Sequence, residues 1–203
     1  MMWAANEFCQ GLQGFHARNR SSLLRAGELI SQQAGSSFSR ALGKSFPQGV
    51  AALFSKPTMT SDQMLEGPIQ ASRAGCEQSA GEVIVVSQDT TSYNMSGHKA
   101  REGLGFIQGK VKGTLQHNVL AWDSAGLPLG LLYQRNWTRG GLNGLENESE
   151  KWLLGLKAVN KHLATSSKRV ILVQDREADI FRFFQAERAA NVDIVVGVYQ
   201  PRK

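Results

Sequence analysis

The chain has 203 residues, 41% of them hydrophobic and 20% charged, and this globular composition excludes a wholly disordered protein. The formal net charge is +6, from 23 lysine and arginine against 17 aspartate and glutamate residues, which is compatible with a polyanionic partner. With no apolar run near the roughly 18 residues of a membrane span and no secretion signal at the N-terminus, neither a membrane nor a secreted protein is expected. The two cysteines, Cys9 and Cys76, have no metal-binding spacing and indicate reduced thiols in a cytosolic protein.

Helical patterns dominate the first 80 residues. Apolar residues recur at spacings of three to five over residues 3–15, which predicts an amphipathic helix. A second helix is expected over residues 21–35, with a serine N-cap at its start and a glycine at its end. The segment 35–49 is rich in glycine and serine and is expected to be a loop. A third helix, capped by Ser61 or Asp62 and running to Ala71, would be kinked by its internal proline.

From residue 82 onward the patterns are those of strands alternating with helices. The continuous apolar run 83–86 is typical of a strand buried on both faces. Alternating apolar residues over 115–121 and 127–133 flank a turn at 123–126 and predict a hairpin. A helix, a strand, a helix and a strand are then expected over residues 146–163, 169–174, 177–189 and 192–198. This order predicts an α/β fold with a mixed sheet and helices.

Two aspartates, Asp89 and Asp175, each follow an apolar strand. Ligands gather beyond the carboxyl ends of strands in parallel α/β sheets, and two carboxylates there repel each other unless a cation lies between them. Mg²⁺ prefers one or two carboxylates together with water and phosphate oxygens, which is the arrangement used in two-metal phosphoryl transfer. The alternative is structural, with Asp175 as a helix N-cap and Asp89 as the first residue of an Asx turn before Thr90.

The other common catalytic patterns are missing from the sequence. Its histidines have no spacing typical of metal ligands, and no serine has the context of an activated nucleophile. We therefore interpret the histidines as surface residues or hydrogen-bonded core residues. They are His16, His98, His117 and His162.

A series of motifs, in order along nearly the whole chain, resembles a known family, the bacterial cut-and-paste DDE transposases of the insertion-sequence-four type. The combination of Asp-Thr-Thr with Asp-Arg-Glu-Ala-Asp after a strand is the most specific part of the match. The motifs are Gln88-Asp89-Thr90-Thr91, Gly113-Thr114-Leu115-Gln116-His117, Leu129-Gly130-Leu131-Leu132-Tyr133-Gln134 with Trp137, Glu148-Ser149-Glu150-Lys151-Trp152, Asp175-Arg176-Glu177-Ala178-Asp179 and Pro201-Arg202-Lys203.

The resemblance implies a helical domain over residues 1–78 that binds transposon ends, and over residues 79–203 most of a ribonuclease H-like catalytic core. It implies that Asp89 and Asp175 are the first two of three metal-binding carboxylates, which hold two Mg²⁺ ions, or Mn²⁺, in the intact parent. Basic side chains are expected to contact double-stranded DNA, and they are Arg18, Arg20, Arg25, Arg176, Arg202 and Lys203. The alternative for Arg176 is a surface arginine at the start of a helix. The alternative for Arg202 and Lys203 is a frayed terminus.

Two departures from the family affect the expected activity. The third carboxylate, a glutamate on a later helix, would lie past Lys203, so the chain is expected to be C-terminally truncated and to cleave DNA negligibly by itself. The segment 12–20 also lacks the acidic residue of the family's end-binding motif. The function expected is that of the N-terminal portion of a homodimeric transposase in the bacterial cytoplasm, associated with the nucleoid. The alternatives are a non-catalytic DNA-binding fragment that interferes with a full-length relative, and a decayed remnant.

Overall fold

A computed structural model describes residues 7, 12, 15–43, 46–57, 59–97, 102–139, 145 and 147–198. The chain divides into two compact units, Met1–Ala71 and Ser72–Lys203. The predicted assignment of separate functions to residues 1–78 and 79–203 stays a prediction. Most of the predicted helix 3–15 lies outside the described residues, as do His98, Arg202 and Lys203. None of the helices in the described ranges combines the length and hydropathy that a membrane span requires.

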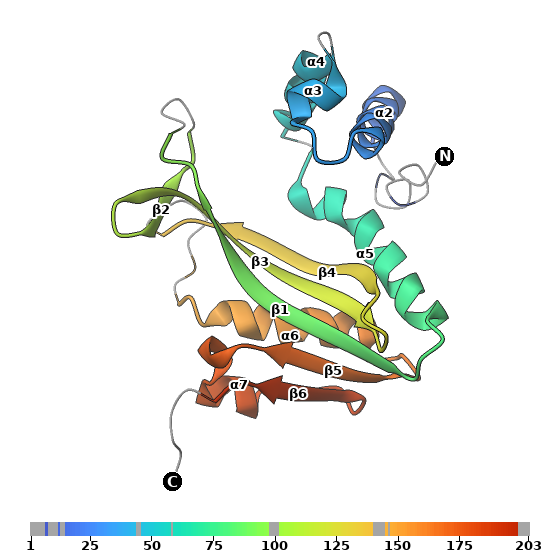
Figure 1. The fold of residues 1–203 in the computed structure, drawn as a ribbon, viewed down its shortest axis with the longest axis vertical. Helices are drawn as coiled ribbons and strands as arrows, with labels where there is room; N and C mark the ends of the chain where they lie inside the picture. The colour runs from blue at the N-terminus through green and yellow to red at the C-terminus, as the bar shows by residue number, and fades with distance from the viewer. Residues whose placement is uncertain are drawn as a thin grey trace. The chain divides into compact units, whose positions relative to one another are not determined.

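The first unit is helical (Figure 1). Its residues 35–49 are not the predicted loop, because Ser37 caps a short helix by accepting a hydrogen bond from Arg40 N at 3.3 Å and a further helix starts at Phe46. Small clusters of buried leucine, methionine, alanine and valine side chains hold these helices together. The helices are α2 (Ala17–Gln32), α3 (Phe38–Leu42), α4 (Phe46–Phe54) and the first part of α5 (Ser61–Gln78).

The helix starts differ from the predicted ones. Helix α2 begins earlier, because His16 is its N-cap and Ser22 lies inside the helix, where its hydroxyl donates to Arg18 O at 2.9 Å. Helix α5 begins after Thr60, whose hydroxyl accepts from Gln63 N at 3.3 Å while Gln63 Oε1 accepts from Thr60 N at 3.2 Å. This reciprocal capping box satisfies two amides at the helix start, so Thr60 rather than Ser61 is the cap. The helix also continues through Pro68 to Gln78.

The second unit contains a six-stranded mixed sheet. The strands follow the order β4-β3-β1-β5-β6, with β2 pairing one end of β3; the first three are antiparallel, and β1, β5 and β6 are parallel. This order confirms the predicted fold class, a mixed sheet with helices. The strands are β1 (Val83–Asn94), β2 (Gly105–Gln108), β3 (Val111–Asp123), β4 (Pro128–Trp137), β5 (Arg169–Gln174) and β6 (Val192–Val196).

Three segments of the structure differ from the prediction because of tertiary contacts. Strand β2 has no apolar pattern of its own and was not predicted. In β4 the alternation fails because Leu132 is an extra residue between the pairs Val119–Tyr133 and Leu120–Leu131, so Leu132 is buried. The predicted helix 177–189 is replaced by a 3₁₀ turn, η1 (Arg176–Ala178), and a short helix, α7 (Phe181–Gln185). Beyond α7, the amide of Asn160 bonds Glu187 O and Ala189 N at 2.9 and 3.1 Å in place of helical partners.

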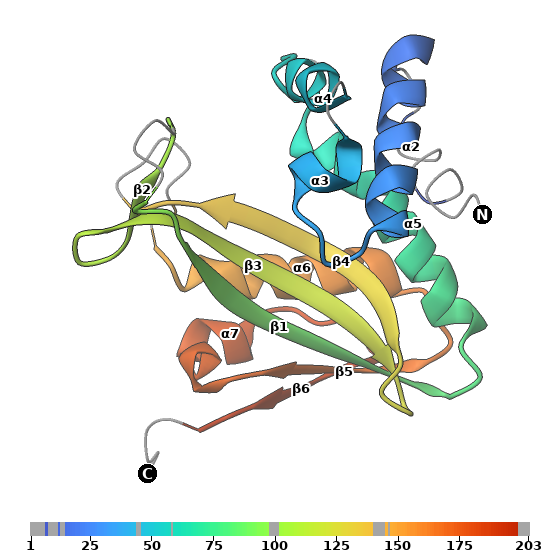
Figure 2. The ribbon, with the colours of Figure 1, turned by 45° about the horizontal axis from the view of Figure 1, so that its top comes forward.

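The main core lies on one face of this sheet. Helix α6 (Glu150–Leu163) lies along that face in both views (Figures 1 and 2), and Phe183 of α7 belongs to the same cluster as Trp152 of α6. Ile84 and Val86 of β1 face this cluster and are fully buried. Val83 and Val85, which alternate with them, are only half-buried. The prediction that β1 is buried on both faces is therefore wrong, because the helices α6 and α7 pack on the same side.

Candidate functional site

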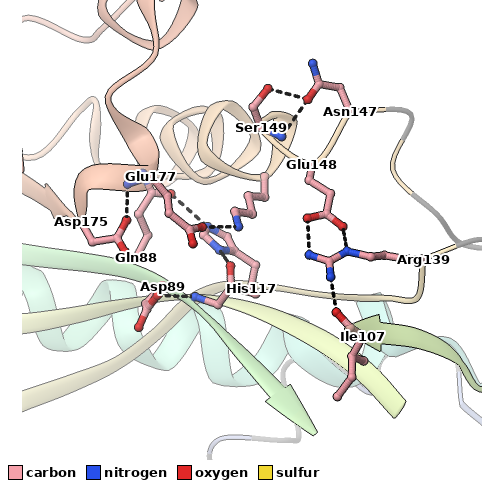
Figure 3. A network of polar contacts seen from close by, with 12 residues as sticks. Gln88, Asp89, Ile107, His117, Arg139, Asn147, Glu148, Ser149, Asp175 and Glu177 are labelled. Carbon is pink, nitrogen blue, oxygen red and sulfur yellow. Dashed lines mark hydrogen bonds and ion pairs between the residues drawn. The ribbon is translucent and has the colours of Figure 1, made fainter. Parts of the chain in front are cut away.

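The register of two parallel strands brings Asp89 and Asp175 together. Strands β1 and β5 pair Gln88 with Gln174, so the residue that follows each glutamine lies at the same level of the sheet. Both aspartates are exposed, and they alternate with glutamines that face the core. Figure 3 shows both aspartates beside Gln88 and on the same side of His117. Whether they bind metal stays a prediction.

Each carboxylate also has a local structural role. Asp175 Oδ1 accepts a hydrogen bond from Glu177 N at 2.9 Å and caps η1, as the structural alternative for this residue predicted. Asp89 Oδ1 accepts from the next amide, Thr90 N, at 2.6 Å, rather than from the second amide along as in an Asx turn. A carboxylate has two oxygens with about four lone pairs, so these bonds are compatible with cation binding.

The core-facing residues next to the aspartates belong to a chain of hydrogen-bonded side chains. We call it the glutamine–histidine chain, and it consists of Gln174, Gln88, His117 and Thr90. Gln174 Nε2 donates to Val195 O at 3.1 Å, and Gln88 Nε2 donates to Gln174 Oε1 at 3.0 Å. Gln88 Oε1 lies 3.2 Å from His117 Nε2, and His117 Nδ1 lies 2.9 Å from Thr90 Oγ1. Because an amide oxygen can only accept, His117 carries its proton on Nε2 and accepts from the Thr90 hydroxyl at Nδ1.

His117 is a neutral core residue. It is 0% exposed and packs edge-on against Trp152, with ring centroids 5.0 Å apart. Burial, together with the nearby ammonium group of Lys151, lowers the pKa of His117 from 6.5 to about 4. This confirms the interpretation of His117 as a hydrogen-bonded core histidine.

Two further carboxylates, Glu177 and Glu148, form ion pairs. Lys151 Nζ of α6 lies 3.0 Å from Glu177 Oε2 and 5.1 Å from the Trp152 ring centroid, and this lysine side chain is only 8% exposed. The Arg139 guanidinium binds both oxygens of Glu148, with Nη2 at 2.7 Å from Oε2, and its Nη1 donates to Ile107 O (Figure 3). This arginine lowers the pKa of the Glu148 carboxyl. Across the described ranges, no group of three or more His, Cys, Asp and Glu side chains is arranged as a metal site.

The predicted DNA-binding arginines in the described part of the chain are all exposed. Arg18 and Arg25 are seven residues apart on α2 and therefore lie on the same side of this helix. Arg20 lies on the opposite side, two residues from Arg18. Arg176 is the first residue of η1, next to Asp175.

The sequence reasoning missed the glutamines and did not recognise the role of His117. A signal was present, since each of these residues continues an alternation of buried positions. Gln88 follows Ile84 and Val86 at a spacing of two, and Gln174 follows Val170 and Leu172 in the same way. A polar residue in such a row is buried and needs a partner.

No protein-family model matches the chain. Three solved structures with weak similarity are complexes of the Mos1 mariner transposase. The paired-end complex with Mn is 12% identical, with a TM-score of 0.32, over 83% of this chain and 57% of that chain. The strand transfer complex is 11% identical, with a TM-score of 0.29, over 94% of this chain and 71% of that chain. The paired-end complex with the left transposon end is 10% identical, with a TM-score of 0.29, over 94% of this chain and 72% of that chain.

This chain thus spans little more than half the length of the first of these proteins. TM-scores of this size do not establish a shared fold.

Proposed function

We propose that the chain is the N-terminal portion of a DNA transposase of the bacterial insertion-sequence-four type. Its helical unit binds transposon ends, and its ribonuclease H-like unit contributes Asp89 and Asp175 to metal-dependent phosphodiester hydrolysis and strand transfer in an intact, homodimeric parent at the nucleoid. The single observation that supports this proposal best is the β1–β5 register, which makes the two aspartates neighbours at the level where β5 ends. The Asp-Thr-Thr and Asp-Arg-Glu-Ala-Asp motifs around them support the same reading.

The donor set suits Mg²⁺ or Mn²⁺. Asp89 and Asp175 offer hard carboxylate oxygens, and neither takes part in the ion pairs Arg139–Glu148, Lys151–Glu177 and Arg169–Asp193. A hard divalent ion completes such a site with water and substrate phosphate oxygens. When bound, it would supply an activated nucleophile and stabilise the leaving oxygen. The chain's own part is to hold the carboxylates in register and to position the phosphate backbone through basic side chains.

Binding of Mn²⁺, followed by electron paramagnetic resonance, tests the metal site. We expect Asp89→Asn and Asp175→Asn each to weaken Mn²⁺ binding by at least about 100-fold, because each removes a charged ligand. Asp193→Asn is the matched control, since this aspartate belongs to the same sheet but pairs with Arg169 at 2.7 Å. Equal Mn²⁺ affinity in all four proteins would refute the proposed site.

On supercoiled DNA we expect negligible nicking, because the described site has no third carboxylate.

A non-catalytic DNA-binding fragment is the second candidate, and the shared side of Arg18 and Arg25 on α2 favours it. We expect Arg18→Ala/Arg25→Ala to weaken binding to double-stranded DNA and to lower the slope of log K against log salt by about 1.8, since two phosphate contacts are lost. Arg20→Ala, on the opposite side of α2, is expected to change the slope little. Fluorescence anisotropy at salt concentrations from about 50 to about 200 mM measures this slope. An unchanged slope in the double variant would mean that the DNA contacts lie elsewhere.

A further inference from the structure

We propose that the glutamine–histidine chain is a positioning device that fixes Asp89 and Asp175 relative to each other and thereby sets the affinity of the cation they hold. This inference rests on the proposed function and assigns a role to residues that do not themselves touch the cation. Gln88, Gln174, His117 and Thr90 are thus positioning residues.

The glutamine–histidine chain anchors the residues on both sides of Asp89 and the residue before Asp175. Gln88 and Thr90 flank Asp89, and both bond to the ring of His117 on the neighbouring strand β3. Gln174 directly precedes Asp175 and bonds to Gln88. Any shift of β1 against β5 that separates the aspartates must therefore stretch or break a buried hydrogen bond.

These polar groups occupy positions where apolar residues would be the default. One level earlier in the same strands the paired core residues are Val86 and Leu172, both fully buried. Gln88 and Gln174 are 2% and 5% exposed, and burial of their amides costs free energy that only well-formed hydrogen bonds offset. Apolar packing is non-directional, whereas hydrogen bonds fix the orientation of the groups they join. The fold thus has a directional link at the level next to the carboxylates.

Helix α6 packs against the glutamine–histidine chain from the core side. Gly155 faces Gln88 Oε1 so closely that a Cβ at this position would overlap it. One turn earlier, Trp152 packs its ring edge-on against His117. The amide and the imidazole are therefore confined on the side that faces α6.

The Mn²⁺ dissociation constant of leucine variants tests this role. We expect Gln88→Leu and Gln174→Leu each to weaken Mn²⁺ binding about tenfold, the lower end of the loss that follows when groups that orient metal ligands are removed. Because both variants break the same link, the double variant should bind about as weakly as the weaker single variant. We expect His117→Gln, which keeps a donor toward Gln88, to retain more affinity than His117→Leu.

Val170→Ala is the matched control. Val170 pairs with Ile84 at the far end of the same two strands, and both side chains are fully buried. Its truncation should lower the melting temperature but leave Mn²⁺ affinity unchanged, which separates positioning from general stability. Circular dichroism verifies folding, and Gln88→Met and Gln174→Met replace any leucine variant that does not fold.

The outcomes distinguish this inference from the proposed function. If the glutamine variants bind Mn²⁺ as tightly as the wild type while Asp89→Asn does not, the positioning role is wrong and the metal site stands. If Val170→Ala weakens binding as much as they do, the effect is one of stability and the positioning role is again wrong. If wild type and Asp89→Asn/Asp175→Asn bind Mn²⁺ equally, the metal site is wrong and the inference falls with it.

Discussion

Replacement of Gly155 by alanine is expected to destabilise the sheet unit by about 3 kcal/mol, from overpacking together with the loss of a buried hydrogen bond. In an exposed helix interior the same change stabilises by about 1 kcal/mol, because alanine is the better helix former. Here the new Cβ would overlap Gln88 Oε1 and approach Val119 Cγ2 to 3.2 Å. Either α6 moves away from β1 or the Gln88–His117 bond breaks, and both outcomes cost free energy.

Urea unfolding followed by circular dichroism measures this effect. Gly75→Ala is the matched control, since Gly75 also lies in a helix of the same unit and its Cβ would meet only Leu129, at 3.6 and 3.9 Å. We expect Gly75→Ala to be neutral or stabilising. If Gly155→Ala is equally well tolerated, the close approach of α6 to β1 is incorrect.

Acid is expected to destabilise the sheet unit through His117. In the unfolded chain a histidine takes up a proton below about pH 6.5, whereas the folded protein keeps His117 neutral until its pKa of about 4. The unfolded state therefore binds more protons between these values, so the free energy of unfolding falls as the pH falls through this window. The loss is about 1.4 kcal/mol per pH unit, or about 3 kcal/mol over the window.

His162 acts in the same direction but is less buried. Burial, together with the positive charges of Lys161 and Arg73, lowers its pKa to about 4. Its exposed part is screened by solvent, so its contribution is expected to be smaller than that of His117.

The variant His117→Gln removes the titrating group and should flatten the dependence of unfolding free energy on pH between about 6.5 and 4. Val170→Ala, which destabilises the core without removing a histidine, should keep the wild-type slope. Urea titrations at several pH values provide the measurement. A slope that is the same in His117→Gln and the wild type would show that the acid sensitivity arises from other groups.

The parts of the fold that the sequence predicted are those whose pattern is local. The apolar run at residues 169–174 matches β5 to the residue, and the alternation around His117 gives the correct face of β3. Asp123 Oδ1 accepts hydrogen bonds from Ala125 N in the turn predicted at 123–126 and from Leu127 N directly after it. These features depend on neighbours within a few residues, so periodicity and turn chemistry are sufficient to find them.

Other elements depend on contacts with distant segments. Strand β2 forms only because β3 offers it an edge, and α7 ends early because Asn160, on another helix, binds the backbone beyond it. The extra residue Leu132 in β4 changes which side chains face the core, and no local pattern reveals it. Such features could not be predicted from periodicity.

The same division holds at the site. The sequence by itself indicated that Asp89 and Asp175 come after apolar runs, and the motifs around them indicated a metal-dependent chemistry. Asp175 does follow β5, but the prediction that Asp89 lies beyond its strand is wrong, because pairing with β3 continues β1 to Asn94. Only the tertiary structure decided that Gln88 bonds to Gln174, 86 residues away, and to His117, 29 residues away. Strand register fixes these partners, and register depends on the packing of the whole sheet against α6, which is why a sequence pattern cannot specify them.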